Sequence, residues 1–149
     1  MADITQIKAY VYTAEEAHAS AEGNVYLGIA GREFLLRKQG QEATHKQGEQ
    51  YTYVLGQDSN LADARYNDPT TPPLDTDDLD HYPVYLRLEP SGVEPAWCLE
   101  WVDVTVNPDT KVPHVFANPR LKGTDPKHRL WLDTSHGKTL YLKRSDDNL

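Results

Sequence analysis

The chain has 149 residues, of which 38% are hydrophobic and 26% are charged, proportions typical of a globular domain with a sizeable core. Its formal net charge of −8 argues against nonspecific binding to nucleic acid, because such binding depends on neutralising phosphate groups. The single cysteine excludes an intrachain disulfide and a multi-cysteine zinc site. We therefore expect one domain over residues 1–149, with no nucleic acid among its partners.

The start of the chain and its hydrophobic runs bear on where the protein is located. The first ten residues, MADITQIKAY, contain neither the basic region nor the apolar core of a secretory signal. No apolar run approaches the roughly 20 residues that a membrane-spanning helix needs. The single cysteine, Cys98, also suits a reducing compartment. We expect a cytoplasmic protein.

The hydrophobic pattern is that of many short β-strands separated by turn residues. In chain order, the expected strands are 7–13, 24–31, 32–38, 49–56, 82–90, 94–106, 114–119, 129–133 and 139–144. The first of them, IKAYVYT, alternates and is rich in β-branched and aromatic residues, as strands are. The pattern predicts an all-β fold, either an antiparallel sandwich or a barrel.

The segment 57–83 differs from the rest of the chain because it is dense in Asp and Pro and lacks periodicity. Pro69, Pro72 and Pro73 cannot donate hydrogen bonds to a central β-ladder, so the segment is expected to be a long loop insertion. A loop of this length inside a compact domain is either functional or disordered, and the sequence leaves both interpretations open.

Within this loop, four residues are candidates for binding: Tyr66 as a bulky side chain, and Asp75, Asp77 and Asp78 as an acidic cluster. The cluster lacks the glycine and the distal glutamate of an EF-hand loop, so a solvated loop is the alternative interpretation. At the other end of the chain, residues 145–149 are expected to form a flexible tail.

The stretch 94–106, EPAWCLEWVDVTV, changes the phase of its alternation halfway along. Trp97 and Leu99 share one phase, whereas Val102 and the two valines that follow it share the opposite phase. Both groups can face the core only if one extra residue is accommodated between them. We predict a β-bulge at Glu100–Trp101. Trp101 would then be partly exposed, as a lid on the sandwich edge or as a contact residue.

Common catalytic signatures are missing from the chain. The six histidines are scattered, and Cys98 lies between two core-type residues, as a small buried hydrophobe does. We therefore expect no enzyme activity. A small hydrolase that uses clustered carboxylates with His81 or His128 is a weaker alternative, since no convergent pair is visible.

Several short motifs follow one another in a recognisable order. They are Thr13 at a strand end, then Asn24-Val25-Tyr26, then Trp97, Leu99, Val102 and Val104, and finally Phe116 with Trp131-Leu132. This order resembles that of the PLAT domain, also called LH2, of lipoxygenases, lipases and polycystin-type proteins. The resemblance runs from about residue 6 to residue 143. It implies an antiparallel β-sandwich of two four-stranded sheets, in which 57–83 is an insertion longer than the family normally has.

The resemblance also implies a function, because PLAT domains dock enzymes to membranes, lipids or partner proteins, often with Ca²⁺ at the loops of one end. It implies a stand-alone, non-catalytic binding module whose partner is a protein or a lipid or membrane surface. Carried over residue by residue, the Ca²⁺ ligands would be Glu15, Glu22, Asn24, Glu49 and Glu94. Two of the family's acidic positions are lost in this chain. The alternative function is a structural subunit of a homo-oligomer or larger assembly, with the surface around Trp101 as the interface.

Overall fold

The computed structural model describes residues 2–91, 96–121, 126–135 and 137–145. The strands are β1 (Gln6–Thr13), β2 (Ala21–Ile29), β3 (Arg32–Leu35), β4 (Thr44–His45), β5 (Gln50–Gly56), β6 (Val84–Pro90), β7 (Trp97–Val106), β8 (His114–Ala117), β9 (Leu130–Leu132) and β10 (Thr139–Arg144). Three short 3-10 helices are η1 (Ala64–Tyr66), η2 (Thr76–Asp80) and η3 (Pro126–His128). In the described part of the chain, no helix is long and apolar enough to cross a membrane.

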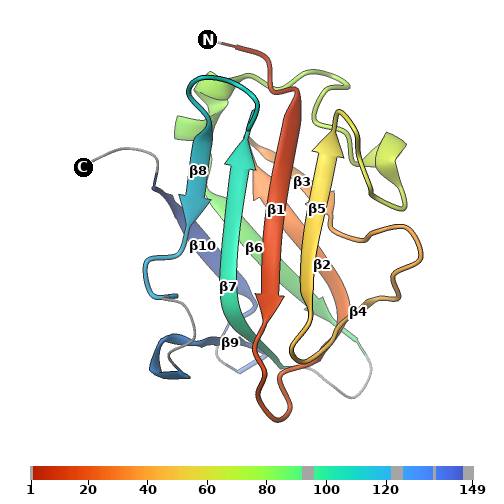
Figure 1. Cartoon of the computed structure of the whole chain (residues 1–149), viewed down its shortest axis with the longest axis vertical. Coiled ribbons are helices and arrows are strands. Elements are labelled where there is room, and N and C mark those ends of the chain that lie inside the picture. Colours follow the sequence, from red (N-terminus) through yellow and green to blue (C-terminus); the bar gives the residue numbers. More distant parts are fainter. Residues whose placement is uncertain (1, 92–95, 122–125, 136, 146–149) are drawn as a thin grey trace.

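The strands form two layers. Eight of them pair in the order β3-β2-β6-β10-β8-β7-β1-β5, and all of these pairings are antiparallel. This path folds over on itself, so that β8, β7, β1 and β5 form the near layer in Figure 1 and β10, β6, β2 and β3 lie behind it. The two short strands β4 and β9 pair with β2 and β7. The predicted antiparallel sandwich of two four-stranded sheets is confirmed.

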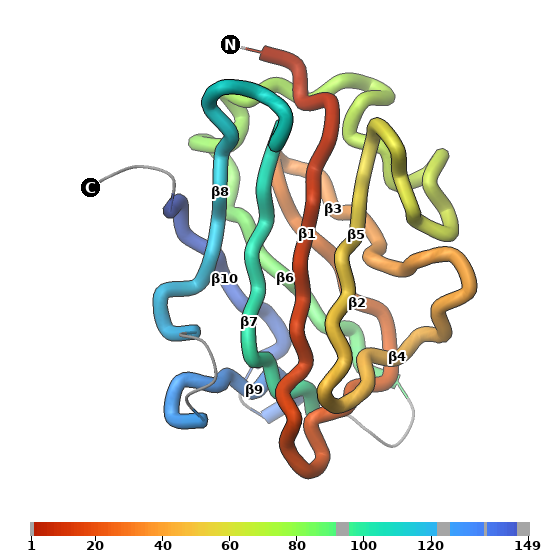
Figure 2. Tube along the Cα trace, viewed as in Figure 1, coloured from red at the N-terminus to blue at the C-terminus, as the bar shows by residue number. Residues whose placement is uncertain are grey.

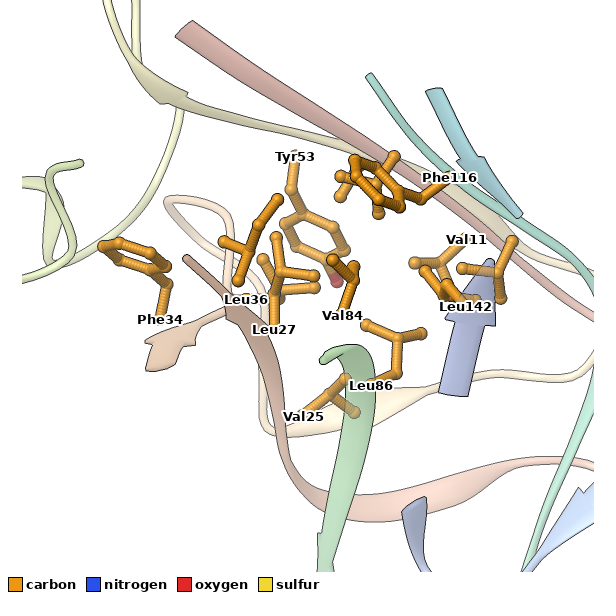
Figure 3. Packing of buried hydrophobic residues seen from close by; sticks show 14 of the residues in the cluster. Val11, Val25, Leu27, Phe34, Leu36, Tyr53, Val84, Leu86, Phe116 and Leu142 are labelled. Carbon is orange, nitrogen blue, oxygen red and sulfur yellow. The ribbon is translucent and has the colours of Figure 1, made fainter. Parts of the chain in front are cut away.

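The core lies between the two layers because alternate residues of each strand point inward. On β1, Ile7, Ala9 and Val11 are fully buried, while the residues between them are not. Figure 3 shows side chains of both layers meeting, with Val11 and Phe116 from the near layer and residues of β2 and β6 from the far layer. Burying such a side chain stabilises the fold by roughly 1.5–3 kcal/mol relative to leaving it in water.

The phase change in β7 is a β-bulge, as predicted. Tyr12 of β1 lies opposite Trp101, but the next residue, Thr13, lies opposite Leu99, so Glu100 has no partner of its own on β1. The extra residue restores the inward phase, and both Leu99 and the later valines of β7 are fully buried. Trp101 itself is half-buried.

The segment 57–83 contains η1 and η2 but no strand. It packs on the end of the sandwich near the N-terminus, where its tube crosses the top of Figure 2. Leu61 and Leu79 are buried, and the amide of Ile4 donates to the carbonyl of Leu74 at 2.7 Å. The segment is therefore held by the core and by the backbone of the first residues, which leaves its binding role open. At the C-terminus, the amide of Ser145 donates to the carbonyl of Val115 at 2.8 Å, and residues 146–149 lie outside the described residues.

Candidate binding groove

The outward-facing residues of β7 form one side of a groove on the near layer. Trp101, Asp103 and Thr105 are half-buried and alternate with the fully buried valines of the same strand. This is the alternation expected of a strand with one face in the core. Because the bulge at Glu100 reverses the phase, Trp101 faces outward although Trp97 faces the core.

Strands β8 and β10 supply the floor and the other side of the groove. In the register of the sheet, Ala117 lies opposite Asp103 on one side and opposite Lys143 on the other. Neighbouring strands are about 4.8 Å apart, so the acid and the base stand about 10 Å apart with only the small side chain of Ala117 between them. This small residue between two long ones forms the hollow.

The groove has a volume of about 630 Å³, which is within the usual range of ligand-binding pockets. Its lining is mostly apolar, with Trp101, Val115, Ala117, Pro119 and Leu121 as the main apolar residues. A groove with this lining can take an aromatic or aliphatic group from a binding partner.

Three charged residues line the groove, Asp103 on one side and Lys143 and Arg144 on the other. The indole Nε1 of Trp101 donates to Oδ2 of Asp103 at 2.7 Å, which orients both side chains. On the other side, Lys143 is exposed and forms no ion pair with the residues that the structure describes. The neighbouring Arg144 differs, because it pairs with Asp80 of η2. Lys143 is therefore available to an anionic group of a ligand.

Tyr66 does not lie at this groove. Its side chain, on η1, is 72% exposed, and the guanidinium carbon of Arg65 is 5.0 Å from the centre of its ring. In Figure 1, η1 lies beyond β5 at one edge of the near layer, whereas the groove is at β8, the opposite edge. The structure therefore does not bring the candidates Tyr66 and Trp101 together within one chain.

Asp75 and Asp78 of the acidic cluster each contact a nearby residue of the loop. The amide of Asp77 donates to Oδ1 of Asp75 at 2.8 Å, so Asp75 caps η2. Oδ1 of Asp78 is 3.7 Å from Nδ1 of His81, whose side chain is 68% exposed. These contacts explain the local fold of η2, and a binding role for the cluster stays a prediction.

The Ca²⁺ candidates have other partners in the structure. Oε1 of Glu15 accepts from Gln47 at 2.8 Å, Glu49 accepts from the hydroxyl of Tyr51, and the side-chain oxygen of Asn24 accepts from Arg37. Glu22 is half-buried in β2. Glu94 lies outside the described residues.

Among the described residues, no three His, Cys, Asp or Glu side chains form a group that could hold a metal ion. The carboxylate of Glu15 does lie against Gly48, the residue before Glu49, so these two acids are neighbours. Two carboxylates fall short of the six to eight oxygens that Ca²⁺ needs. A calcium site that includes Glu94 stays a prediction.

Cys98 and His45 are buried titratable groups that lie outside the groove. Burial and the nearby Glu16 carboxylate raise the pKa of the Cys98 thiol to about 12. Burial lowers the pKa of His45 to about 4, and its Nε2 lies 2.7 Å from the hydroxyl of Tyr53. At pH 7, Cys98 is therefore a protonated thiol and His45 a neutral ring. The expected character of Cys98 as a small buried hydrophobe is confirmed.

Trp101 is predicted from the sequence as a contact residue, but the other residues of the groove are not. Ala117 and Lys143 lie in segments that are far apart in sequence and become neighbours only through the pairing of β8 with β10. Strand pairing of this kind has no local signal. The alternation of β8, with Val115 and Ala117 outward and Phe116 buried, was the one hint in the sequence.

Comparisons with known proteins identify the fold. No protein-family model matches the chain, and no curated protein matches its sequence. Among solved structures, a lipoxygenase variant in complex with arachidonate covers 94% of this chain with a TM-score of 0.55 and 14% identity. The alpha-toxin of Clostridium absonum covers 95% with a TM-score of 0.57 and 19% identity. An alpha-toxin from an avian strain of Clostridium perfringens covers 95% with a TM-score of 0.56 and 19% identity.

The chain spans only part of these proteins, 16% of the lipoxygenase chain and 32% of each alpha-toxin chain. At identities below 20%, the likeness establishes the fold alone. The fold is that of a PLAT/C2-like β-sandwich domain, in agreement with the architecture that the sequence predicted.

Proposed function

We propose that this chain is a non-catalytic, PLAT-like binding module that attaches to a lipid surface, with a partner protein as the alternative. The observation that carries the proposal is the coverage of the structural likeness. The match takes up nearly all of this chain, 94–95%, but a minor share of the lipoxygenase and the alpha-toxins. The chain thus corresponds in fold to one domain of a larger protein. The sequence motifs follow one another as they do in the PLAT family, and this resemblance supports a docking role for the chain.

The lipid-facing surface is proposed to be the end of the sandwich that carries the β1–β2 turn and β9. Trp131 on β9 is 37% exposed there, although its neighbours Leu130 and Leu132 are more buried. Tryptophan favours the boundary between water and lipid, because its ring is apolar and its N–H is polar. The opposite end is less suitable, since the segment 57–83 covers it with seven aspartates.

Calcium is a separate part of the proposal. The described side chains do not make up a Ca²⁺ site by themselves, so lipid attachment is proposed without a step that depends on the metal. Glu15 and Glu49 lie at the same end as Trp131, and they are the residues through which Ca²⁺ would act if Glu94 completes a site.

The expected cytoplasmic location also stays a prediction, which cell fractionation would test.

Co-sedimentation with phospholipid vesicles tests the proposal. We expect the protein to pellet with phosphatidylcholine vesicles, and phosphatidylserine vesicles show whether anionic headgroups help or hinder. Each mixture is run with millimolar Ca²⁺ and with a chelator, which separates lipid docking from calcium dependence. Protein that stays in the supernatant in all four mixtures would exclude lipid docking and leave the protein-partner alternative.

A further inference from the structure

We propose that this chain associates with itself head to tail, with Tyr66 of one copy seated in the Trp101 groove of the next copy. The inference goes beyond the lipid-docking proposal and does not depend on it, because it concerns a different surface. It rests on three observations about the described residues: an apolar groove beside an unpaired lysine, an exposed aromatic side chain three residues after an unpaired acid, and their places on opposite edges of one layer.

Charge is divided unevenly along the chain in a way that suits this contact. Residues 118–145, which include the β10 side of the groove, contain seven Lys or Arg and two Asp or Glu, a net charge of +5. The segment 57–83, which presents Tyr66, contains seven Asp and one Arg, a net charge of −6. Arg129 is paired with Glu16 and Glu100, and Arg144 with Asp80 of the acidic segment, so the attraction between two copies rests on Lys143 beside the groove and Asp63 near Tyr66.

The exposed side chain matches the groove in kind. Tyr66 is 72% exposed, the largest exposed fraction among the large hydrophobic side chains that the structure describes. Tyrosine is enriched among residues that anchor protein interfaces, because its rigid ring buries a large area at a low entropic cost. The groove at Trp101 and Ala117 offers an apolar hollow of about 630 Å³, larger than one tyrosine ring.

The charges beside the ring and beside the groove complete the contact. Asp63, the N-cap residue of η1, lies close to Tyr66 in the chain, and its exposed carboxylate bonds to none of the described residues. Lys143 on the rim of the groove likewise lacks an ion pair within the described structure. With the Tyr66 ring on Ala117, Asp63 of one copy pairs with Lys143 of the next.

The positions of anchor and groove determine the form of the assembly. They lie at opposite edges of the near layer, beyond β5 and at β8, so a chain cannot fill its own groove (Figure 1). Two copies joined in this way leave one anchor and one groove free. The contact is heterologous, and repeating it gives open chains of copies.

Sedimentation of the full chain from micromolar to millimolar concentration tests the inference. We expect a mass that rises with concentration in the wild type. Tyr66→Ala and Ala117→Phe should each weaken the association about tenfold or more, since each removes one half of an anchored contact. Lys143→Glu provides a second groove variant that changes only an exposed residue. Tyr141→Ala, at a 60% exposed tyrosine, and Lys46→Glu are matched controls that should associate like the wild type.

A mixture of two variants gives the sharpest result. Tyr66→Ala keeps a working groove, and Ala117→Phe keeps a working anchor, so an equimolar mixture should form one-to-one dimers and nothing larger. A wild type that stays monomeric at millimolar concentration would overturn the inference. Association that survives Tyr66→Ala would also overturn it. So would a mixture of the two variants that forms no dimer although the wild type associates. Vesicle binding by Tyr66→Ala should be unchanged, which separates this inference from lipid docking.

Discussion

Glu100, the extra residue of the bulge in β7, forms a two-pronged ion pair with Arg129. Nη2 of Arg129 is 3.0 Å from Oε1 of Glu100, and its Nε is 3.3 Å from Oε2. Arg129 also contacts Oε2 of Glu16 in the β1–β2 turn at 3.2 Å. The Glu100 side chain is 3% exposed and that of Arg129 is 13% exposed. The bulge that restores the phase of the strand thus places a carboxylate inside the protein, where one arginine neutralises it.

Removing that arginine should strongly destabilise the fold. Arg129→Met leaves Glu100 buried without a partner, and we expect a loss of about 3–5 kcal/mol in the free energy of unfolding, measured by urea denaturation. The double variant Glu100→Leu/Arg129→Met removes the charge as well, so it should recover most of the loss. A single variant within about 0.5 kcal/mol of the wild type would show that water reaches Glu100 and that the pair is not buried.

His45 should make stability depend on pH. Its pKa is about 4 in the folded protein and about 6.5 in an unfolded chain. Between these values the unfolded chain binds more protons, so the contribution of His45 is complete above about pH 6.5 and is lost as the pH falls toward 4. We expect wild-type stability to fall by about 3 kcal/mol more than that of His45→Phe over this range.

The His45 variant needs a matched control, because carboxylates also titrate in acid. His81 is 68% exposed, so His81→Gln is the matched removal of an exposed histidine. The test compares urea midpoints of the three proteins between pH 7 and pH 4. Parallel curves for the wild type and His45→Phe would mean that His45 is solvated and titrates normally in the native state.

The side chain of Asn107, in the turn after β7, forms hydrogen bonds with the backbone of the N-terminal segment. Its Oδ1 accepts from the amide of Thr5 at 2.8 Å, its Nδ2 donates to the carbonyl of Asp3 at 3.1 Å, and its φ is +53°. Asn107→Gly loses the side-chain hydrogen bonds but adopts the left-handed backbone without strain. Asn107→Ala loses the same hydrogen bonds, and its Cβ disfavours the left-handed backbone as well. We expect Ala to be about 1 kcal/mol less stable than Gly in thermal unfolding. Equal stability of the two variants would contradict a left-handed backbone at this residue.

Thermal unfolding also tests whether the native protein binds Ca²⁺. The family resemblance predicts a Ca²⁺ site formed by Glu15, Glu22, Asn24, Glu49 and Glu94, and binding to the native state alone must raise Tm. A hundredfold excess of Ca²⁺ over Kd would add about 2.7 kcal/mol to the free energy of unfolding. Glu49→Gln should remove the rise, and Asp78→Asn, in the loop at the other end, should retain it. A Tm that millimolar Ca²⁺ leaves unchanged would contradict a calcium site in this protein.

Much of the fold could be predicted because it follows from local alternation. The phase change between Leu99 and Val102 was enough to predict the bulge, since only an inserted residue keeps both in the core. The burial of His45 could not be predicted, because its neighbours in sequence are polar. His45 is buried because β4 lies beside β2 and the ring lies 4.9 Å from that of Trp97, a contact between distant segments.

The candidate groove was predictable only in part, for a similar reason. Trp101 was identifiable as a contact residue from the bulge alone. Its partners Ala117 and Lys143 depend on the pairing of β8 with β7 and β10, which brings together residues with no shared pattern in the sequence. A short strand such as β8 carries too few residues to specify its neighbours by alternation.

The most direct test of surface attachment is the fraction of the 149-residue chain that co-sediments with phosphatidylcholine vesicles as the lipid concentration rises. We expect a saturable bound fraction for the wild type and a weaker one for Trp131→Ala, whose side chain is proposed to enter the lipid boundary. Val112→Ala changes a 69% exposed side chain in the turn between β7 and β8, at the opposite end, and should bind like the wild type. A bound fraction that stays at background for the wild type, or that Trp131→Ala leaves unchanged, would contradict lipid docking at this end of the sandwich.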